Sequence, residues 1–82
     1  MNQIKILLFA TLRDRAGVRA LEMQVPLATT VAELKHLLGQ RLPGLKGLLG
    51  HSLIAVNREY VFDAALIPPD AEVALFPPVS GG

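Results

Sequence analysis

One long amphipathic helix pattern, from Thr30 to Leu42, stands among segments that otherwise favour strands, and this restricts the fold more than any other feature. Thr30 and Glu33 form the Thr-x-x-Glu sequence of a capping box just before the apolar pattern. The apolar positions recur at helical spacing: Val31, Leu34, Leu37, Leu38 and Leu42. Pro43 and Gly44 end the helix. Because one helix covers only one face of a sheet, the pattern predicts an α+β domain with a second, open face.

Strand patterns flank this helix on both sides. They predict strands at residues 3–10, 18–25, 52–57, 58–62 and 72–76, hence a mixed sheet of four to five strands. Residues 11–17 are expected to be a loop that closes at Gly17, so that the first two strands form an antiparallel hairpin. Residues 45–51 are broken by glycines and predict a turn or a short 3₁₀ segment. A turn is also expected at Asn57, because Asn tolerates left-handed backbone.

The composition excludes several classes of protein. With 82 residues, 51% hydrophobic and 18% charged, the chain is one folded domain and not a disordered segment. A net charge of +1 does not indicate nucleic acid or an anionic membrane as partner. The short apolar run near the start is soon followed by Arg13, which does not suit a signal peptide, and no stretch has the length of a membrane span. A cytoplasmic protein is expected.

Catalytic and metal-binding side chains are scarce. The chain has no cysteine, which excludes disulfides, cysteine nucleophiles and thiolate metal sites. His36 and His51 have no second ligand at metal spacing, so we expect no metal. No spacing suggests a serine-histidine-acid triad, and no glycine-rich phosphate loop is present. Catalysis by this chain alone is therefore not expected.

The chain ends with two prolines and two glycines. Pro77 and Pro78 lack backbone donors and favour an extended conformation, so the predicted organisation is a domain at residues 1–76 and a tail at residues 77–82. Six extended residues reach roughly 20 Å. Gly81 and Gly82 have no Cβ, which leaves the terminal carboxylate accessible to an enzyme. Once joined to AMP, this carboxylate would be open to attack by a sulfur or amine nucleophile.

The tail has two interpretations from its residues alone. No charged side chain occurs between Val73 and Gly82, which suits a segment that enters a narrow pocket. The same ending is also compatible with a frayed terminus or a cloning remnant, and the charge distribution with chance.

The order of elements and the ending resemble the ubiquitin-like β-grasp sulfur carriers, and among them the small subunits of molybdopterin synthase. The resemblance covers essentially the whole chain. Its segments are KILLFATLRDRAG at 5–17, TTVAELKHLL at 29–38, AVNREYV at 55–61 and DAEVALFPPVSGG at 70–82, and the last is the most specific. The alternatives are a thiamine-pathway carrier, a protein modifier that is joined to lysines, and a passive ubiquitin-like interaction module.

The resemblance implies a two-step cycle at Gly82, with Gly81 beside it. An E1-like adenylyltransferase would use ATP to adenylate Gly82, and a persulfide donor protein would convert the adenylate to a thiocarboxylate. The tail would then enter the large subunit of a heterotetrameric molybdopterin synthase and give its sulfur to cyclic pyranopterin monophosphate. The carrier itself would bind no cofactor.

The resemblance also places a partner surface. In a β-grasp the first and last strands are central, adjacent and parallel, so their C-terminal ends lie together. Phe9 and Phe76 would then emerge on the open face, near Leu7, at the start of the tail; exposed aromatic clusters often mark partner surfaces. The alternative is that loops cover the rings. The expected interface residues are Leu7, Phe9, Phe76, Pro77, Pro78, Val79 and Ser80.

Overall fold

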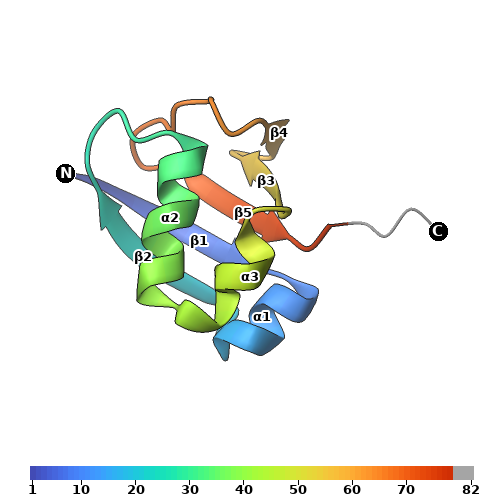
Figure 1. Cartoon of the computed structure of the whole chain (residues 1–82). Helices are drawn as coiled ribbons and strands as arrows, with labels where there is room; N and C mark the ends of the chain where they lie inside the picture. The colour runs from blue at the N-terminus through green and yellow to red at the C-terminus, as the bar shows by residue number, and fades with distance from the viewer. Residues whose placement is uncertain (79–82) are drawn as a thin grey trace.

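A computed structural model describes residues 1–78; the predicted site positions Val79, Ser80, Gly81 and Gly82 lie outside the described residues. The elements are, in chain order, β1 (Asn2–Leu8), α1 (Ala10–Ala16), β2 (Ala20–Val25), α2 (Val31–Arg41), the 3₁₀ turn η1 (Pro43–Leu45), α3 (Lys46–Leu49), β3 (Leu53–Val56), β4 (Glu59–Val61) and β5 (Glu72–Phe76) (Figure 1).

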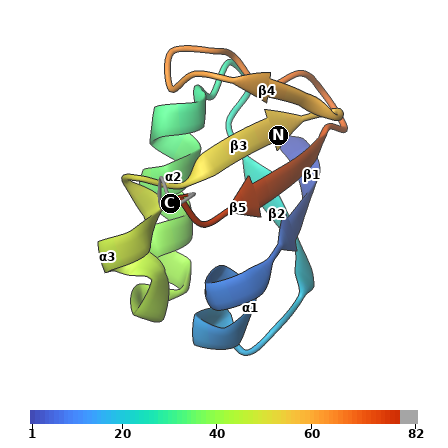
Figure 2. The ribbon, with the colours of Figure 1, turned by 90° about the vertical axis from the view of Figure 1, so that its right-hand side faces the viewer.

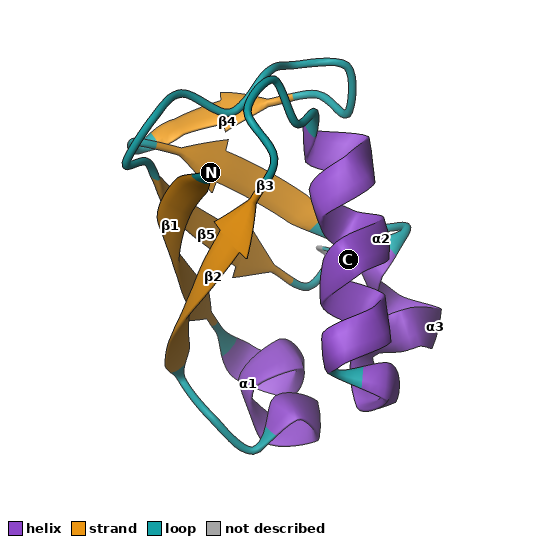
Figure 3. Ribbon diagram, turned by 90° about the vertical axis from the view of Figure 1, so that its left-hand side faces the viewer, coloured by secondary structure: helices purple, strands orange, loops and turns teal. Residues whose placement is uncertain are grey.

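The described strands form one mixed sheet in the order β2-β1-β5-β3-β4. The central pair β1 and β5 is parallel, and the other neighbouring pairs are antiparallel. Figure 3 shows α2 and α3 on the same side of this sheet. The predicted α+β β-grasp fold, with a mixed sheet and one main helix on one face, is confirmed.

The core lies between α2 and the sheet. Alternation places Ile4, Ile6 and Leu8 of β1 on the helix side, and Val73 and Leu75 of β5 beside them. The helix contributes its predicted stripe: Val31, Leu34 and Leu38 are buried, and Leu37 and Leu42 are partly buried against the core. Among residues 1–78, no aromatic side chain belongs to this core. Its stability therefore rests on the close packing of aliphatic groups.

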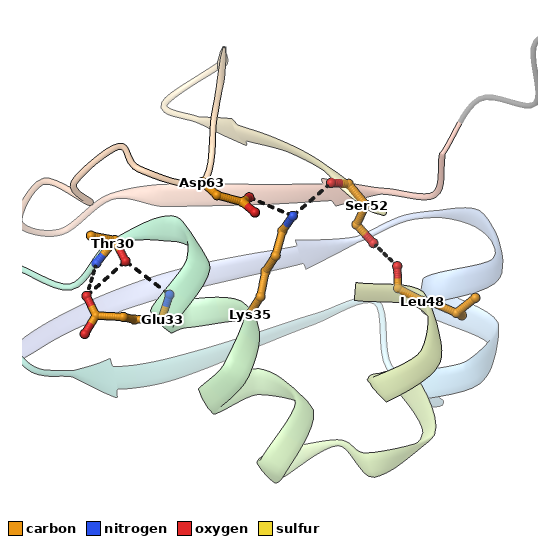
Figure 4. A network of polar contacts seen from close by, with 6 residues as sticks. All are labelled: Thr30, Glu33, Lys35, Leu48, Ser52 and Asp63. Atoms are coloured by element: carbon orange, nitrogen blue, oxygen red, sulfur yellow. Dashed lines mark hydrogen bonds and ion pairs between the residues drawn. The ribbon is translucent and has the colours of Figure 1, made fainter. Parts of the chain in front are cut away.

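The predicted capping box at the start of α2 is confirmed (Figure 4). The Glu33 backbone N–H donates to the Thr30 hydroxyl oxygen at 3.2 Å, and the Glu33 carboxylate accepts from the Thr30 backbone N–H at 3.0 Å. These bonds satisfy donors that the first helical turn leaves unpaired. The backbone N–H of Thr30, followed by its hydroxyl, lowers the pKa of the Glu33 carboxyl.

Two predicted loop segments contain helices. Residues 11–17 were predicted as a loop, but α1 occupies Ala10–Ala16 and ends at Gly17, whose φ of 77° is left-handed. The predicted first strand therefore ends at Leu8, because Phe9 precedes the first turn of α1. Leu12 is the one residue of α1 that is buried, and a single apolar position gives no helical period. The segment after α2 likewise contains the four-residue helix α3 in addition to η1.

Two asparagine side chains hold the segment that leads into β5. Asn57 and Arg58 have φ values of 50° and 71°, as a two-residue hairpin turn between β3 and β4 requires. The Asn57 side-chain oxygen accepts from the Glu72 backbone N–H at 2.9 Å, at the start of β5. At the start of β1, the Asn2 side-chain oxygen accepts from the Asp70 backbone N–H at 2.8 Å. These bonds hold the entry to β5 against both of its neighbours.

No helix within residues 1–78 is long and apolar enough to cross a membrane.

We predict that Leu75→Ala lowers the free energy of unfolding by about 2–5 kcal/mol, because it empties a fully buried site between β1 and β3. Phe76→Ala, one residue further along β5 and partly exposed, should cost less. Urea unfolding of both variants measures the difference. Equal losses would contradict the assignment of the two faces of β5.

We also predict a pH dependence at the capping box. The lowered pKa of Glu33 means that its contribution to stability is present above the pKa in the unfolded chain and is lost as the pH falls through the pKa in the folded chain. The difference in unfolding free energy between the wild type and Glu33→Gln should therefore shrink between about pH 5 and pH 3. Urea titrations at fixed pH values measure it, and a constant difference would rule out the ionised capping bond.

Candidate functional site

The parallel pairing of β1 with β5 brings the ends of both strands to one edge of the domain. Figure 2 shows β1 and β5 side by side, and in their pairing Leu7 lies opposite Ala74 and Leu8 opposite Leu75. One residue later, the Phe9 backbone N–H donates to the Leu75 carbonyl oxygen at 3.3 Å. Phe9 thus continues the pairing beyond the end of β1, and its ring is directed to the face opposite Leu8.

The two predicted aromatic residues meet at this edge. The rings of Phe9 and Phe76 stack, with centroids 4.7 Å apart and an angle of 11° between their planes. Phe9 keeps 39% of its surface exposed, and Phe76 and Leu7 are partly exposed. The rings therefore cover one another in part and are not enclosed by loops. The predicted proximity of Phe9 and Phe76 is confirmed; the role of these two residues and of Leu7 in binding a partner stays a prediction.

Tyr60 and Leu53 extend this surface, and the sequence interpretation missed both. The Tyr60 ring lies 6.1 Å from that of Phe76 and is 71% exposed, and Leu53 lies opposite Phe76 in the pairing of β3 with β5. Their identification depends on the register of β3 and β4 against β5, which no local pattern reveals. We call Leu7, Phe9, Leu53, Tyr60 and Phe76 the aromatic patch.

The start of the tail adjoins the aromatic patch. β5 ends at Phe76, as predicted, and Pro77 and Pro78 follow without forming a strand. Pro77 is half-buried and Pro78 exposed. Because neither proline has a backbone N–H, these two residues add no donor to the sheet. The aromatic patch therefore lies directly beside the point where the chain leaves the sheet.

The polar residues of the described chain are placed for structure and surface contact. The Lys35 ammonium lies 2.9 Å from a carboxylate oxygen of Asp63, and His36 contacts the Gln40 amide on the same helix. Asp70 and Glu72 lie at the turn and at the entry to β5. Within residues 1–78, no three His, Cys, Asp or Glu side chains are grouped so that they could hold a metal ion. The aromatic patch at the end of β5 therefore offers a ligand mainly apolar contact area.

The similarity to known proteins extends over the C-terminal residues 77–82 as well as over the domain. The family model described as the ThiS family matches residues 6–82. The molybdopterin synthase sulfur carrier subunit of Escherichia coli (strain K12) is 41% identical over 81 residues, which cover 96% of this chain and 99% of that protein. The protein of the same name from Arabidopsis thaliana is 35% identical over 80 residues, which cover 98% of this chain and 83% of that protein.

Among solved structures, the small archaeal modifier protein 1 of H. volcanii superimposes with a TM-score of 0.86 and 28% sequence identity. The match covers 96% of this chain and 100% of that chain. The fold therefore occurs both in proteins named as sulfur carriers and in a protein named as a modifier.

Proposed function

The chain belongs to the ThiS family, and we propose that it is the sulfur carrier subunit of a molybdopterin synthase. Relatives of that name align with almost the whole chain. The observation that carries the proposal is the arrangement at the end of β5. Phe76 stacks on Phe9 just before the Pro-Pro pair, so the segment that leads to the Gly-Gly ending starts at an exposed aromatic patch.

The first step in this proposal is activation of Gly82. A carboxylate oxygen of Gly82 attacks the α-phosphorus of ATP on an E1-like adenylyltransferase, and pyrophosphate leaves. The terminal sulfur of a persulfide donor protein then attacks the acyl carbon, and AMP leaves. A further thiol of the donor cleaves the resulting acyl disulfide, which releases the thiocarboxylate and forms a disulfide on the donor side. The absence of a side chain at Gly81 and Gly82 reduces steric hindrance to each attack.

The second step is transfer in the large subunit of the synthase. The thiocarboxylate sulfur forms a bond to a side-chain carbon of cyclic pyranopterin monophosphate, and a carbon–oxygen bond at that carbon breaks, so that the oxygen leaves as water or stays on the phosphate. Water then cleaves the acyl–sulfur bond, which returns Gly82 to a carboxylate and leaves the sulfur on the product as a thiol. Because a dithiolene contains two sulfur atoms, each product requires two thiocarboxylated carriers, or one carrier that is converted to the thiocarboxylate twice. The acid, base and phosphate-binding groups belong to the large subunit, and ATP is used by the activating enzyme. The proposal places this cycle in the cytoplasm, where ATP is available.

In this proposal, the described residues of the chain position the domain on its partner enzyme. The aromatic patch, with Pro77 and Pro78, provides the contact by which a partner holds the domain while the last four residues enter its active site. Aromatic side chains suit this task, because they bring a large contact area at a small cost in side-chain entropy.

A second candidate function is protein modification. The similarity to small archaeal modifier protein 1 favours it, because the same acyl-adenylate can react with a lysine amine in place of a persulfide. The two functions diverge only after activation. The product at the C-terminus therefore distinguishes them.

We predict that intact mass spectrometry of the protein isolated from its native cells shows a species heavier by the difference between a sulfur and an oxygen atom. Deletion of Gly82 should abolish it, because the acyl group that carries the sulfur is then missing. The Leu27→Ser variant, changed at an exposed residue distant from the tail, is the control. A series of heavier protein adducts without the sulfur species would instead indicate protein modification.

We further predict that the double variant Phe9→Ser/Phe76→Ser binds the large subunit roughly 30-fold more weakly or worse, as expected for loss of an interface hot spot. Isothermal titration calorimetry with the purified large subunit measures the affinity. Leu27→Ser/Leu66→Ser is a matched control, because it removes two exposed apolar side chains at the other end of α2, where Leu66 pairs with Thr30. Wild-type affinity in the Phe9/Phe76 variant would refute the assignment of the aromatic patch.

A further inference from the structure

A groove of about 640 Å³ lies beside the aromatic patch, between α2 and the outer edge of the sheet. Its lining includes Lys35, Gly50, Leu53, Tyr60, Phe62 and Asp63. Leu53 and Tyr60 belong to the aromatic patch as well, so the two surfaces are continuous. The outer strand here is β4, which pairs only with β3 among the described strands, so its other edge is open to a partner.

The distribution of aromatic residues singles out this region. The chain has three Phe and one Tyr and no Trp. All four lie in the aromatic patch or the groove, and Phe62 is 91% exposed. Aromatic side chains commonly dominate protein cores, yet the core of this domain contains none among residues 1–78. Gathered on one surface, they have the composition of the centre of a protein interface.

The charged groups of the groove already pair with one another. The Lys35 ammonium lies 2.9 Å from a carboxylate oxygen of Asp63 and donates a hydrogen bond to the Ser52 carbonyl oxygen at 3.3 Å (Figure 4). The Lys35 side chain is 11% exposed, so its charge is compensated within the domain. An occupant of the groove therefore needs no charge of its own, and an apolar side chain fits best.

We propose that this groove receives an apolar side chain from the large subunit of the synthase. The inference rests on the proposed function and extends the interface from the aromatic patch to β4 and Phe62. A stable interface buries about 800 Å² on each partner, whereas the partly exposed side chains of the aromatic patch offer roughly 400 Å². The groove and Phe62 supply part of the remainder. In the proposed function the large subunit holds the carrier in a heterotetramer, so this interface is the one that needs the additional area.

Gly50→Leu tests the groove by filling it from within. Gly50 has a right-handed helical backbone and a Cβ there meets nothing within 4 Å, so a side chain can start at this position without strain or a Cβ clash. Gly47→Leu is the matched control, because a Cβ at Gly47 also meets nothing within 4 Å but Gly47 does not line the groove. Thermal unfolding checks that both variants fold like the wild type. Phe62→Ala is a second test, because it removes an almost fully exposed ring.

The measurement is the affinity for the purified large subunit by isothermal titration calorimetry, with thiocarboxylate formation by the activating enzyme followed in parallel. We expect Gly50→Leu and Phe62→Ala to weaken binding about tenfold each, and Gly47→Leu to bind like the wild type. Wild-type affinity in Gly50→Leu and Phe62→Ala would overturn the inference. Loss of thiocarboxylate formation with unchanged affinity would assign the groove to the activating enzyme and would equally overturn it.

The proposed function is tested separately from the groove. If the wild-type chain fails to bind any large subunit, the proposed function fails. If the wild type binds, Phe9→Ser/Phe76→Ser weakens binding and the groove variants do not, only the groove inference fails.

Discussion

The parallel pairing of β1 with β5 is the constraint on which the rest of this structure depends. It joins the first strand of the chain to the last, and the Asn2 side chain and the Phe9 backbone N–H bond to the β5 segment at the two ends of the pair. Parallel strands need a long crossover, and here the crossover holds α2, which covers one face of the sheet. The other face stays open beside Phe76. The place where the chain leaves the sheet after Phe76 is thus a consequence of strand order.

Aliphatic and aromatic residues are separated in this domain, because the described core contains no aromatic side chain and Phe9, Tyr60 and Phe62 are exposed. Two neighbouring residues of β5 illustrate this separation. Leu75, on one face of the strand, is fully buried, whereas Phe76, on the other face, stacks on Phe9 at the surface. The core consists of Leu, Ile, Val, Met and Ala side chains, and the capping box and the Asn2 and Asn57 bonds hold the ends of its elements. The aromatic side chains lie outside this core and expose apolar area to water, which in the proposed function a partner covers.

Local patterns were enough to predict the elements whose signals are local. The Thr30–Glu33 capping box, the alternation in β1 and the bounds of β5 follow from neighbouring residues and are confirmed. The helix α1 was missed because one buried residue, Leu12, creates no period. Tyr60 and the groove were missed for a different reason. They depend on the register of β3 and β4 against β5, which is decided by packing between segments far apart in the chain.

In the proposed cycle, the aromatic patch must serve the activating enzyme and the large subunit in turn. Both need the same tail, so their complexes exclude each other, and the carrier must leave one before it meets the other. In this cycle the thiocarboxylate and carboxylate forms of the carrier differ by a single atom at Gly82. Since Gly82 is not part of the aromatic patch, the contacts of the patch are the same in both forms. The direction of the cycle must then come from the active sites that hold the tail, since a ligand shifts an equilibrium only by its differential affinity for the two states. A groove that adds affinity for the large subunit alone would favour the synthase complex without hindering activation.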